Sequence, residues 1–383
     1  MKFIHLSDLH IGKIVNKFSM LTDQQYILEQ ILGIIKSESP DAVIIAGDVY
    51  DRSFPPSDAV TELDEFIFKL SEENFDTFII SGNHDSAERL SFGSRIMSKN
   101  GIHISPVYNG RVEPVTLTDE FGEVNVYMLP FIKPTNVKNF FPEKADDIKS
   151  SYTIALKVAI ENMNVDTSKR NIIVSHQFVN GVKTSESEIS VGGSDNVDCD
   201  VYEPFDYTAL GHIHSPQSIS GLEHIRYCGT PLKYSFSEYK DKSVTVVEMS
   251  EKGTPVTVRE IPLKPMHDMR IIEGSFDEVH SNGSSDPNNE DYVRVDLTDK
   301  ADVPNAMQRL RDVYPTIMGM RYLREKRTSQ SDFSRTANVK EKTPLELFGD
   351  FFKNITGEEL DDKKLEYMKA LIERIEDRED ETD

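Results

Sequence analysis

Five short apolar runs in this chain each end no more than three positions before a residue that can bind a metal ion. The runs are 2–6, 42–46, 78–80, 171–175 and 207–211. Runs of this length, separated by segments with helical periodicity, predict the buried strands of an α/β sheet. Because such sheets place their ligands at the carboxyl ends of the strands, we expect the residues that follow the runs to meet at one rim.

Seven of these following residues are of types that bind divalent cations. They are Asp8, His10, Asp48, Asn83, His176, His212 and His214. Carboxylate, imidazole and amide ligands without a thiolate suit Mn²⁺, Fe²⁺ or Zn²⁺ in open coordination rather than a closed structural zinc site. Seven ligands exceed the need of one ion, so the sequence predicts two ions that share Asp48. Such a pair, about 3.5–4 Å apart, is suited to hydrolysis of a phosphate ester.

His84 and Asp85 complete the stretch from Gly82 to Asp85 without being needed as ligands. Beside the metal ions, His84 is placed to stabilise the phosphate or to protonate the leaving oxygen, and Asp85 is expected to orient its ring. A single histidine is more often a structural residue. Five of the chain's 10 histidines follow this pattern, which favours a functional site instead.

Length and composition restrict the class of protein. A chain of 383 residues suggests two or three domains. No apolar stretch is long enough to cross a bilayer, and the amino terminus runs straight into the first strand, so we expect a cytoplasmic protein that contacts no membrane.

The net charge of -23 argues against binding nucleic acid through overall charge, although two metal ions and a local basic patch can provide attraction. Cys199 and Cys228 share no metal-binding spacing and are expected to be reduced.

Changes in pattern divide the chain into five segments. They are an α/β domain at 1–263, a small α+β unit at 264–327, a linker at 328–342, a helix pair at 343–376 and an acidic tail at 377–383. Pro262 and Pro265 mark the first boundary, and a polar composition marks the linker. Thr343-Pro344 begins the helix pair, because proline is favoured at the first position of a helix.

Periodicity predicts the elements within the first two segments. In the α/β domain we expect helices at 23–36, 57–70 and 153–162, a further helical stretch at 86–97 and a hairpin over 112–129. Short β runs after His214 make the sheet mixed rather than purely parallel. In the small unit we expect strands at 269–273, 292–297 and 318–324, a loop at 281–289 and a helix at 303–313.

Two later features each have two interpretations. The small unit carries a group of basic residues that form either a solvated face or a contact surface for a phosphate backbone. They are Arg309, Arg311, Arg321, Arg324, Lys326 and Arg327. The helix pair either folds back onto the core or places its apolar stripe in a groove of another protein.

The short motifs resemble those of the calcineurin-like metallophosphoesterases. They are Asp8-Leu9-His10, 47–52, 82–85, His176 and 211–214. The stretches 47–56, 185–188, 210–217 and 227–236 further resemble the SbcD family, the nuclease subunits of bacterial SbcCD complexes, and this resemblance covers nearly the whole chain. It implies a double β-sheet phosphoesterase domain flanked by helices, a capping unit that helps to select DNA, and terminal helices at 343–376 that bind the SbcC ATPase.

The resemblance also implies an activity and an assembly. The activity is Mn²⁺-dependent exonuclease cleavage of double-stranded DNA and endonuclease cleavage of single-stranded DNA, coupled to ATP on SbcC, and the assembly is a homodimer within a heterotetramer. The family's metal positions fall on the seven residues given above, and its catalytic histidine falls on His84. Related nucleases have a second catalytic histidine where this chain has Asp51-Arg52, so Arg52 is a candidate for phosphate contact.

Two alternatives compete with a nuclease. The first is a protein phosphatase or a cyclic-nucleotide phosphodiesterase on the same fold, which needs neither a cap nor a partner-binding helix pair. The second is a scaffold that holds SbcC on DNA without cutting it. The seven ligand positions and His84 are all intact, which argues against the scaffold.

Overall fold

The computed structural model describes residues 1–73, 75–185, 188 and 196–323, and a few positions between 345 and 368. The expected linker, the acidic tail and nearly all of the expected helix pair lie outside the described residues. Residues 1–188 and 196–324 form one compact unit. Among the described helices, none is long and apolar enough to cross a membrane.

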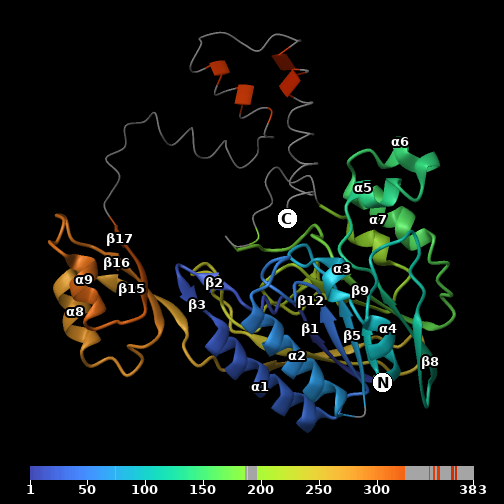
Figure 1. Ribbon diagram of the computed structural model, residues 1–383, viewed down its shortest axis with the longest axis horizontal. Coiled ribbons are helices and arrows are strands. Elements are labelled where there is room, and N and C mark those ends of the chain that lie inside the picture. Colours follow the sequence, from blue (N-terminus) through green and yellow to red (C-terminus); the bar gives the residue numbers. More distant parts are fainter. Residues whose placement is uncertain are drawn as a thin grey trace. The chain divides into compact units, whose positions relative to one another are not determined.

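Two six-stranded mixed sheets form the centre of this unit (Figure 1). The first has the order β14-β13-β1-β4-β5-β6 and consists of β1 (Lys2–Leu6), β4 (Ala42–Ala46), β5 (Asp76–Ile80), β6 (Ile102–Ile104), β13 (Ser243–Glu248) and β14 (Thr257–Pro262). The second has the order β11-β12-β10-β9-β8-β7 and consists of β7 (Val115–Asp119), β8 (Gly122–Met128), β9 (Arg170–His176), β10 (Tyr207–Gly211), β11 (Gln217–Ile219) and β12 (Leu222–Tyr227). The central strands β1, β4 and β5 are parallel to one another, as are β9 and β10. The predicted α/β fold with a double β-sheet sandwich is confirmed.

Alternate residues of the central strands fill the space between the two sheets. Ile44 of β4 shares one buried cluster with Ile172 and Val174 of β9. Val43 and Ile45, which point the other way, belong to the cluster formed with the helices outside the first sheet. Each central strand is therefore buried on both faces, which explains why its sequence is a continuous apolar run.

Helices cover the outer faces of both sheets. The first sheet carries α1 (Leu21–Glu38) and α2 (Ser57–Ser71), and α5 (Pro134–Lys138), α6 (Ala145–Ile148) and α7 (Tyr152–Glu161) lie on the side of the second sheet (Figure 1). The stretch expected to be helical at 86–97 is split into α3 (Ala87–Leu90) and α4 (Ser94–Met97), because Gly93 adopts a φ of 76° between them. The remaining short elements are β2 (Ile14–Val15), β3 (Phe18–Ser19), η1 (Ser98–Asn100), η2 (Pro142–Lys144) and η4 (Cys199–Tyr202).

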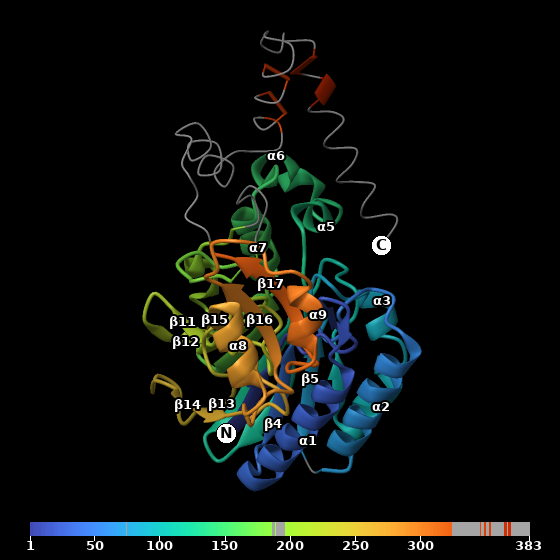
Figure 2. The same ribbon diagram turned by 90° about the vertical axis from the view of Figure 1, so that its left-hand side faces the viewer.

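A separate parallel sheet forms the small α+β unit. Its strands are β15 (Met269–Gly274), β16 (Tyr292–Leu297) and β17 (Ile317–Tyr322), and α8 (Phe276–Gly283) and α9 (Ala306–Arg311) pack on one face of it (Figure 2). Helix α8 is absent from the sequence expectation, which has only a loop from residue 281. The overlooked signal is a capping box between Ser275 and Glu278, followed by a short apolar face.

A buried carboxylate on α1 joins the small sheet to the double-sheet core. Asp23, only 1% exposed, accepts hydrogen bonds from the hydroxyl of Tyr292 at 2.8 Å and from the backbone N–H of His267 at 3.2 Å. The next residue, Gln24, donates to the carbonyl oxygen of His10 at 2.7 Å and accepts from the N–H of Gly12 at 2.9 Å. The turn of α1 that holds the small unit therefore also holds the loop that carries a predicted metal ligand.

Candidate metal centre

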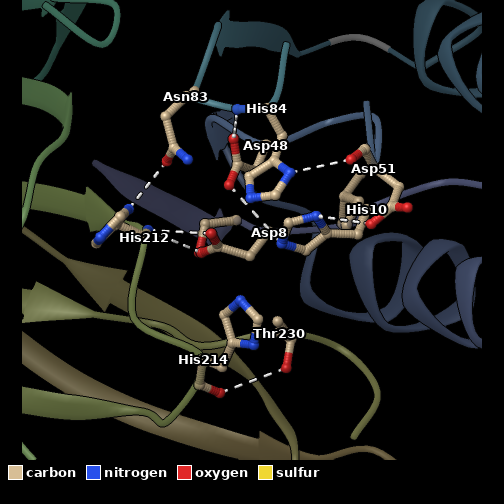
Figure 3. Close-up of polar contacts among 12 residues, drawn as sticks. Asp8, His10, Asp48, Asp51, Asn83, His84, His212, His214 and Thr230 are labelled. Atoms are coloured by element: carbon tan, nitrogen blue, oxygen red, sulfur yellow. Dashed lines mark hydrogen bonds and ion pairs between the residues drawn. The ribbon is translucent and has the colours of Figure 1, made fainter. Parts of the chain in front are cut away.

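The seven predicted ligands converge at one rim shared by the two sheets, and Figure 3 labels all of them except His176. Asp8 and His10 follow β1, Asp48 follows β4, Asn83 follows β5, His176 ends β9, and His212 and His214 follow β10. The rim forms because both sheets present the carboxyl ends of their central parallel strands on the same side.

Their ligand atoms form two overlapping clusters. Atoms of Asp8, His10 and His214 lie within 4.8 Å of one another, as do atoms of Asp8, Asp48 and His176. The Oδ2 atom of Asp48 lies 3.3 Å from Nε2 of His176 in its own cluster and 3.7 Å from Nε2 of His10 in the other, so this carboxylate lies between those two histidines.

The Asn83 amide links two further histidines. Its Oδ1 atom lies 3.0 Å from Nε2 of His176 and 3.0 Å from Nδ1 of His212, the second contact being drawn in Figure 3. An amide oxygen and two imidazole nitrogens thus meet beside the cluster of Asp8, Asp48 and His176.

His10 shows that these side chains suit a cation. Both of its ring nitrogens are buried and make no hydrogen bond with any residue that the structure describes. Leaving such atoms unpaired inside a protein costs free energy, which a metal–nitrogen bond would offset. Burial holds the pKa of His10 well below its usual range and so favours the neutral imidazole, the form that binds metal.

The carboxylates of the site also require positive charge. Burial disfavours the charged form of Asp48, but the neighbouring His176 outweighs burial and holds the pKa of Asp48 well below its usual range. Burial likewise opposes charge on His176, yet Asp48 raises the pKa of His176 to about 9. Burial raises the pKa of Asp8 to about 6. Two buried carboxylates beside neutral-favouring imidazoles such as that of His10 are a donor set that fits divalent cations.

The backbone at the rim is strained in the places where ligands are presented. Asp8, His10, Asp48 and His212 have φ angles of 52°, 47°, 47° and 106°, in the region that side-chain-bearing residues rarely adopt. Hydrogen bonds hold this conformation: the N–H of Asp8 donates to Gly47 O at 3.0 Å, and the N–H of His10 donates to Asp48 O at 2.9 Å. Strain that neighbouring contacts maintain in this way is typical of functional sites.

Three glycines directly precede ligands because a Cβ atom would not fit there. A Cβ on Gly82 would lie 2.1 Å from Oδ1 of Asp48, and one on Gly47 would lie 2.4 Å from Nδ1 of His176. A Cβ on Gly211 would lie 1.8 Å from the carbonyl oxygen of Ala46. The glycines of the short motifs therefore allow the ligand loops to approach each other closely.

Gly82→Ala is expected to lower the amount of Mn²⁺ bound per chain, because the new methyl group displaces the Asp48 carboxylate. Metal content after dialysis, measured by mass spectrometry, tests this expectation. Gly33→Ala is the matched control, since a Cβ at Gly33 on α1 meets nothing within 4 Å. Wild-type metal content in Gly82→Ala would contradict the argument.

His84 lies at the open side of the clusters. Its Nδ1 atom is 3.0 Å from the carbonyl oxygen of Asp51, and its ring centre is 4.9 Å from that of His10 (Figure 3). One of its nitrogens lies within 4.8 Å of the ligand atoms of His10 and Asp48. The ring is thus fixed by a backbone carbonyl beside the predicted metal positions.

The prediction that Asp85 orients the ring of His84 is wrong. The Asp85 carboxylate accepts backbone hydrogen bonds from Val49 at 3.0 Å, Tyr50 at 2.9 Å and Gly82 at 2.9 Å. These N–H groups belong to two adjoining loops and need an acceptor. Asp85 therefore fastens the Asp48 loop to the Asn83 loop and acts on the site through their backbone.

Arg52 is exposed and makes no hydrogen bond or ion pair within the described part of the chain. The contact of its guanidinium with phosphate therefore stays a prediction. The preceding residue, Asp51, forms an ion pair with Lys13 at 2.6 Å, a contact that motif reading did not anticipate.

Several residues behind the ligands carry no motif and were not predicted. Gln24 holds the His10 loop, and Tyr234 donates its hydroxyl to Leu9 O at 2.7 Å. Glu238 contacts His214. The stretch 227–236, which includes Tyr234, contributes to the family resemblance, and this resemblance is the sequence signal that points to these supporting residues.

Comparison with known proteins identifies the family of this chain. The family model of calcineurin-like phosphoesterases matches residues 1–216, and that of the type 5 capsule protein repressor C-terminal domain (SbcD_C) matches residues 265–356. The SbcD subunit of the SbcCD nuclease from Staphylococcus epidermidis is 33% identical over 390 residues, covering 99% of this chain and 100% of the relative. Its counterpart from Staphylococcus saprophyticus is 35% identical over 389 residues, covering 97% and 99%. A dimetal phosphatase structure from Danio rerio aligns with a TM-score of 0.40 at 11% identity, covering 70% of this chain and 98% of the other. The chain belongs to the SbcD family of calcineurin-like metallophosphoesterases.

Proposed function

We propose that this chain is a metal-dependent DNA nuclease that acts with an SbcC ATPase on DNA ends and hairpins during repair and replication. The observation that carries the proposal is the convergence of seven ligand side chains beside His84. The names of the two bacterial relatives support the nuclease assignment and the partner. The proposed cleavage is exonucleolytic on double strands and endonucleolytic on single strands, in the cytoplasm.

The seven ligands divide naturally between two divalent ions, which we propose to be Mn²⁺. Asp8, His10 and His214 would hold one ion, and Asn83, His176 and His212 the other, with Asp48 between them. When bound, such ions neutralise the phosphate and favour ionisation of the attacking water.

His84 is proposed to supply the proton that the leaving group needs. Hydrolysis forms a bond from water oxygen to phosphorus and breaks the bond from phosphorus to the leaving oxygen, which must then take up a proton. With Nδ1 donating to the carbonyl oxygen of Asp51, Nε2 is the nitrogen that can carry this proton to the substrate.

Cleavage of end-labelled DNA tests the proposed function directly. Purified chain is incubated with double- or single-stranded DNA and with Mn²⁺ or Mg²⁺, in the presence and absence of SbcC and ATP. We expect Mn²⁺-dependent cutting that SbcC and ATP extend at duplex ends. Absence of cutting by metal-loaded protein that instead clears phosphopeptides or cyclic nucleotides would favour the phosphatase alternative.

We propose that the small unit at 264–327 caps bound DNA, although its arginines contribute unequally. Arg321 is paired with Asp296 at 2.7 Å, and the guanidinium of Arg309 lies 4.1 Å from the ring centre of Phe276. These two residues therefore have structural roles. Arg311 is exposed and remains a candidate for a phosphate contact, whereas 324–327 lie outside the described residues.

The helix pair at 343–376 is proposed to bind SbcC. Deleting 343–383 is expected to leave Mn²⁺-dependent cutting of single strands unchanged, because the ligand side chains all lie within 1–214. Association with SbcC is expected to be lost, which co-purification measures. Continued co-purification of the shortened chain with SbcC would show that the docking segment lies elsewhere.

We further propose a homodimer, for which an exposed apolar patch around α2 to α4 provides support. Phe54, Phe92 and Ile96 are 59%, 86% and 72% exposed, and the first two line a groove of about 400 Å³. Apolar groups gathered in this way favour association with a second copy.

Phe92→Asp is expected to reduce the mass measured by light scattering from that of two chains to that of one. Phe121→Asp, at the exposed turn between β7 and β8, is the control, and an unchanged mass in Phe92→Asp would locate the interface elsewhere.

A further inference from the structure

A buried carboxylate lies directly behind one of the metal-ligand histidines. Glu238 is only 3% exposed, and its Oε1 atom is 3.1 Å from Nδ1 of His214. A carboxylate can only accept, so Nδ1 must carry the hydrogen in this contact. The imidazole lone pair then resides on Nε2, the nitrogen that can bind a metal ion.

The Glu238 carboxylate is itself fixed from behind by a buried lysine. The Nζ atom of Lys242 donates to Oε2 of Glu238 at 2.6 Å and to Oγ1 of Thr230 at 2.6 Å. The same ammonium donates to the carbonyl oxygen of His214 at 2.8 Å. Lys242 thus positions both the carboxylate and the backbone of the histidine that the carboxylate contacts.

A third charged residue holds the other side of the His214 backbone. The N–H of His214 donates to Oε1 of Glu188 at 2.5 Å, and a second oxygen of Glu188 accepts from the N–H of Ser185 at 2.6 Å. The backbone N–H, the backbone carbonyl and the ring Nδ1 of His214 are therefore each held by a charged side chain.

A buried network of charged side chains costs more free energy than is needed merely to fill the same space. Burying a lysine–glutamate pair requires desolvation of both charges, and apolar side chains of similar volume are often as stable or more stable. The network is explained if the position and tautomer of His214 must be fixed, because metal-binding histidines commonly have a carboxylate on the other ring nitrogen.

We propose that Glu238 is a positioning residue that fixes His214 as the Nδ1–H tautomer and so strengthens the metal site formed by Asp8, His10 and His214. The proposal rests on the proposed function, in that it assumes metal binding at these residues. It assigns Lys242 the role of holding Glu238 in place. It also predicts an effect on one metal ion only, because Glu238 reaches the site through its contact with His214, which belongs to the group with Asp8 and His10.

The test is a Mn²⁺ titration of the full chain by calorimetry and equilibrium dialysis. Glu238→Ala is expected to weaken one of the two bound ions by about 10- to 100-fold, the usual cost of removing an outer-shell partner, and to leave the other within about twofold. Glu238→Gln retains an oxygen that can accept from Nδ1 and is expected to show a smaller loss. Asp296→Asn is the matched control, because Asp296 is equally buried and pairs with Arg294 and Arg321 in the small unit.

Nitrogen NMR of labelled histidine gives a readout that a purely structural role would not change. We expect the His214 signals, assigned by comparison with His214→Asn, to show a protonated Nδ1 in the wild type and a mixture of tautomers in Glu238→Ala. If Glu238→Ala does not fold, the double variant Glu238→Gln with Lys242→Met removes both buried charges together and is titrated in its place.

Two outcomes would overturn the assignment. One is wild-type affinity for both ions in every folded Glu238 variant, and the other is a wild-type tautomer of His214 in those variants. Failure of the proposed function is distinguishable from either, since it would appear as two tightly bound ions in the wild type without any cleavage of DNA.

Discussion

Asp48→Asn is expected to abolish DNA cleavage and to reduce bound Mn²⁺ from about two ions per chain to less than one. The reason is the position of the Asp48 carboxylate between the two ligand clusters, 3.3 Å from Nε2 of His176 and 3.7 Å from Nε2 of His10. Asparagine keeps the shape of the side chain and can still accept the N–H of His84, a bond of 2.8 Å in the wild type. The substitution therefore removes the negative charge while preserving the loop.

The loss in Asp48→Asn should exceed the roughly 10- to 100-fold in metal affinity that removal of an outer-shell partner costs. Metal content by mass spectrometry and cleavage of end-labelled single strands measure the two effects separately. Asp296→Asn again controls for loss of a buried carboxylate away from the rim. Retention of two tightly bound ions in Asp48→Asn would show that another group, such as Asp8, connects the clusters.

The convergence of these side chains could be predicted because it depends on a local pattern. Each predicted ligand lies within four positions of the end of an apolar run, and parallel strands bring the ends of such runs together whatever the details of the loops. His176 and Asp48 are 128 positions apart in the numbering, yet one ends β9 and the other follows β4 at the same rim. The continuous apolar run of Val43, Ile44 and Ile45 likewise indicates a strand buried on both faces, because successive side chains of a strand point to opposite sides.

The partners of these ligands could not be predicted because they depend on how loops fold in three dimensions. Asp85 is adjacent to His84 in sequence, yet its oxygens are used by N–H groups of Val49, Tyr50 and Gly82. Adjacent side chains in a loop need not face one another, so sequence proximity was a poor guide. Helix α8 was missed for a different reason, since its polar residues obscured a short apolar face.

His84→Gln is expected to retain both metal ions and DNA binding and to lower the rate of cleavage by about 10²- to 10⁴-fold, the usual contribution of a positioned proton donor. In the wild type Nδ1 of His84 is held 3.0 Å from the carbonyl oxygen of Asp51, which directs the other nitrogen to the substrate. Glutamine can keep a hydrogen bond to that carbonyl but has no group that transfers a proton near neutral pH. The loss should therefore lie in kcat, with little change in KM.

Metal content distinguishes this role from that of a ligand. A nitrogen of His84 lies within 4.8 Å of the ligand atoms of His10 and Asp48, so geometry alone would also allow His84 to bind an ion. His103→Gln is the matched control, because His103 is paired with Asp76 at 2.8 Å at the edge of the first sheet and should affect neither property. If His84→Gln loses an ion together with its activity, His84 is a ligand. If it keeps both ions and loses only kcat, the seven other side chains are sufficient to hold the metals, and the ring beside Asp51 serves the leaving group.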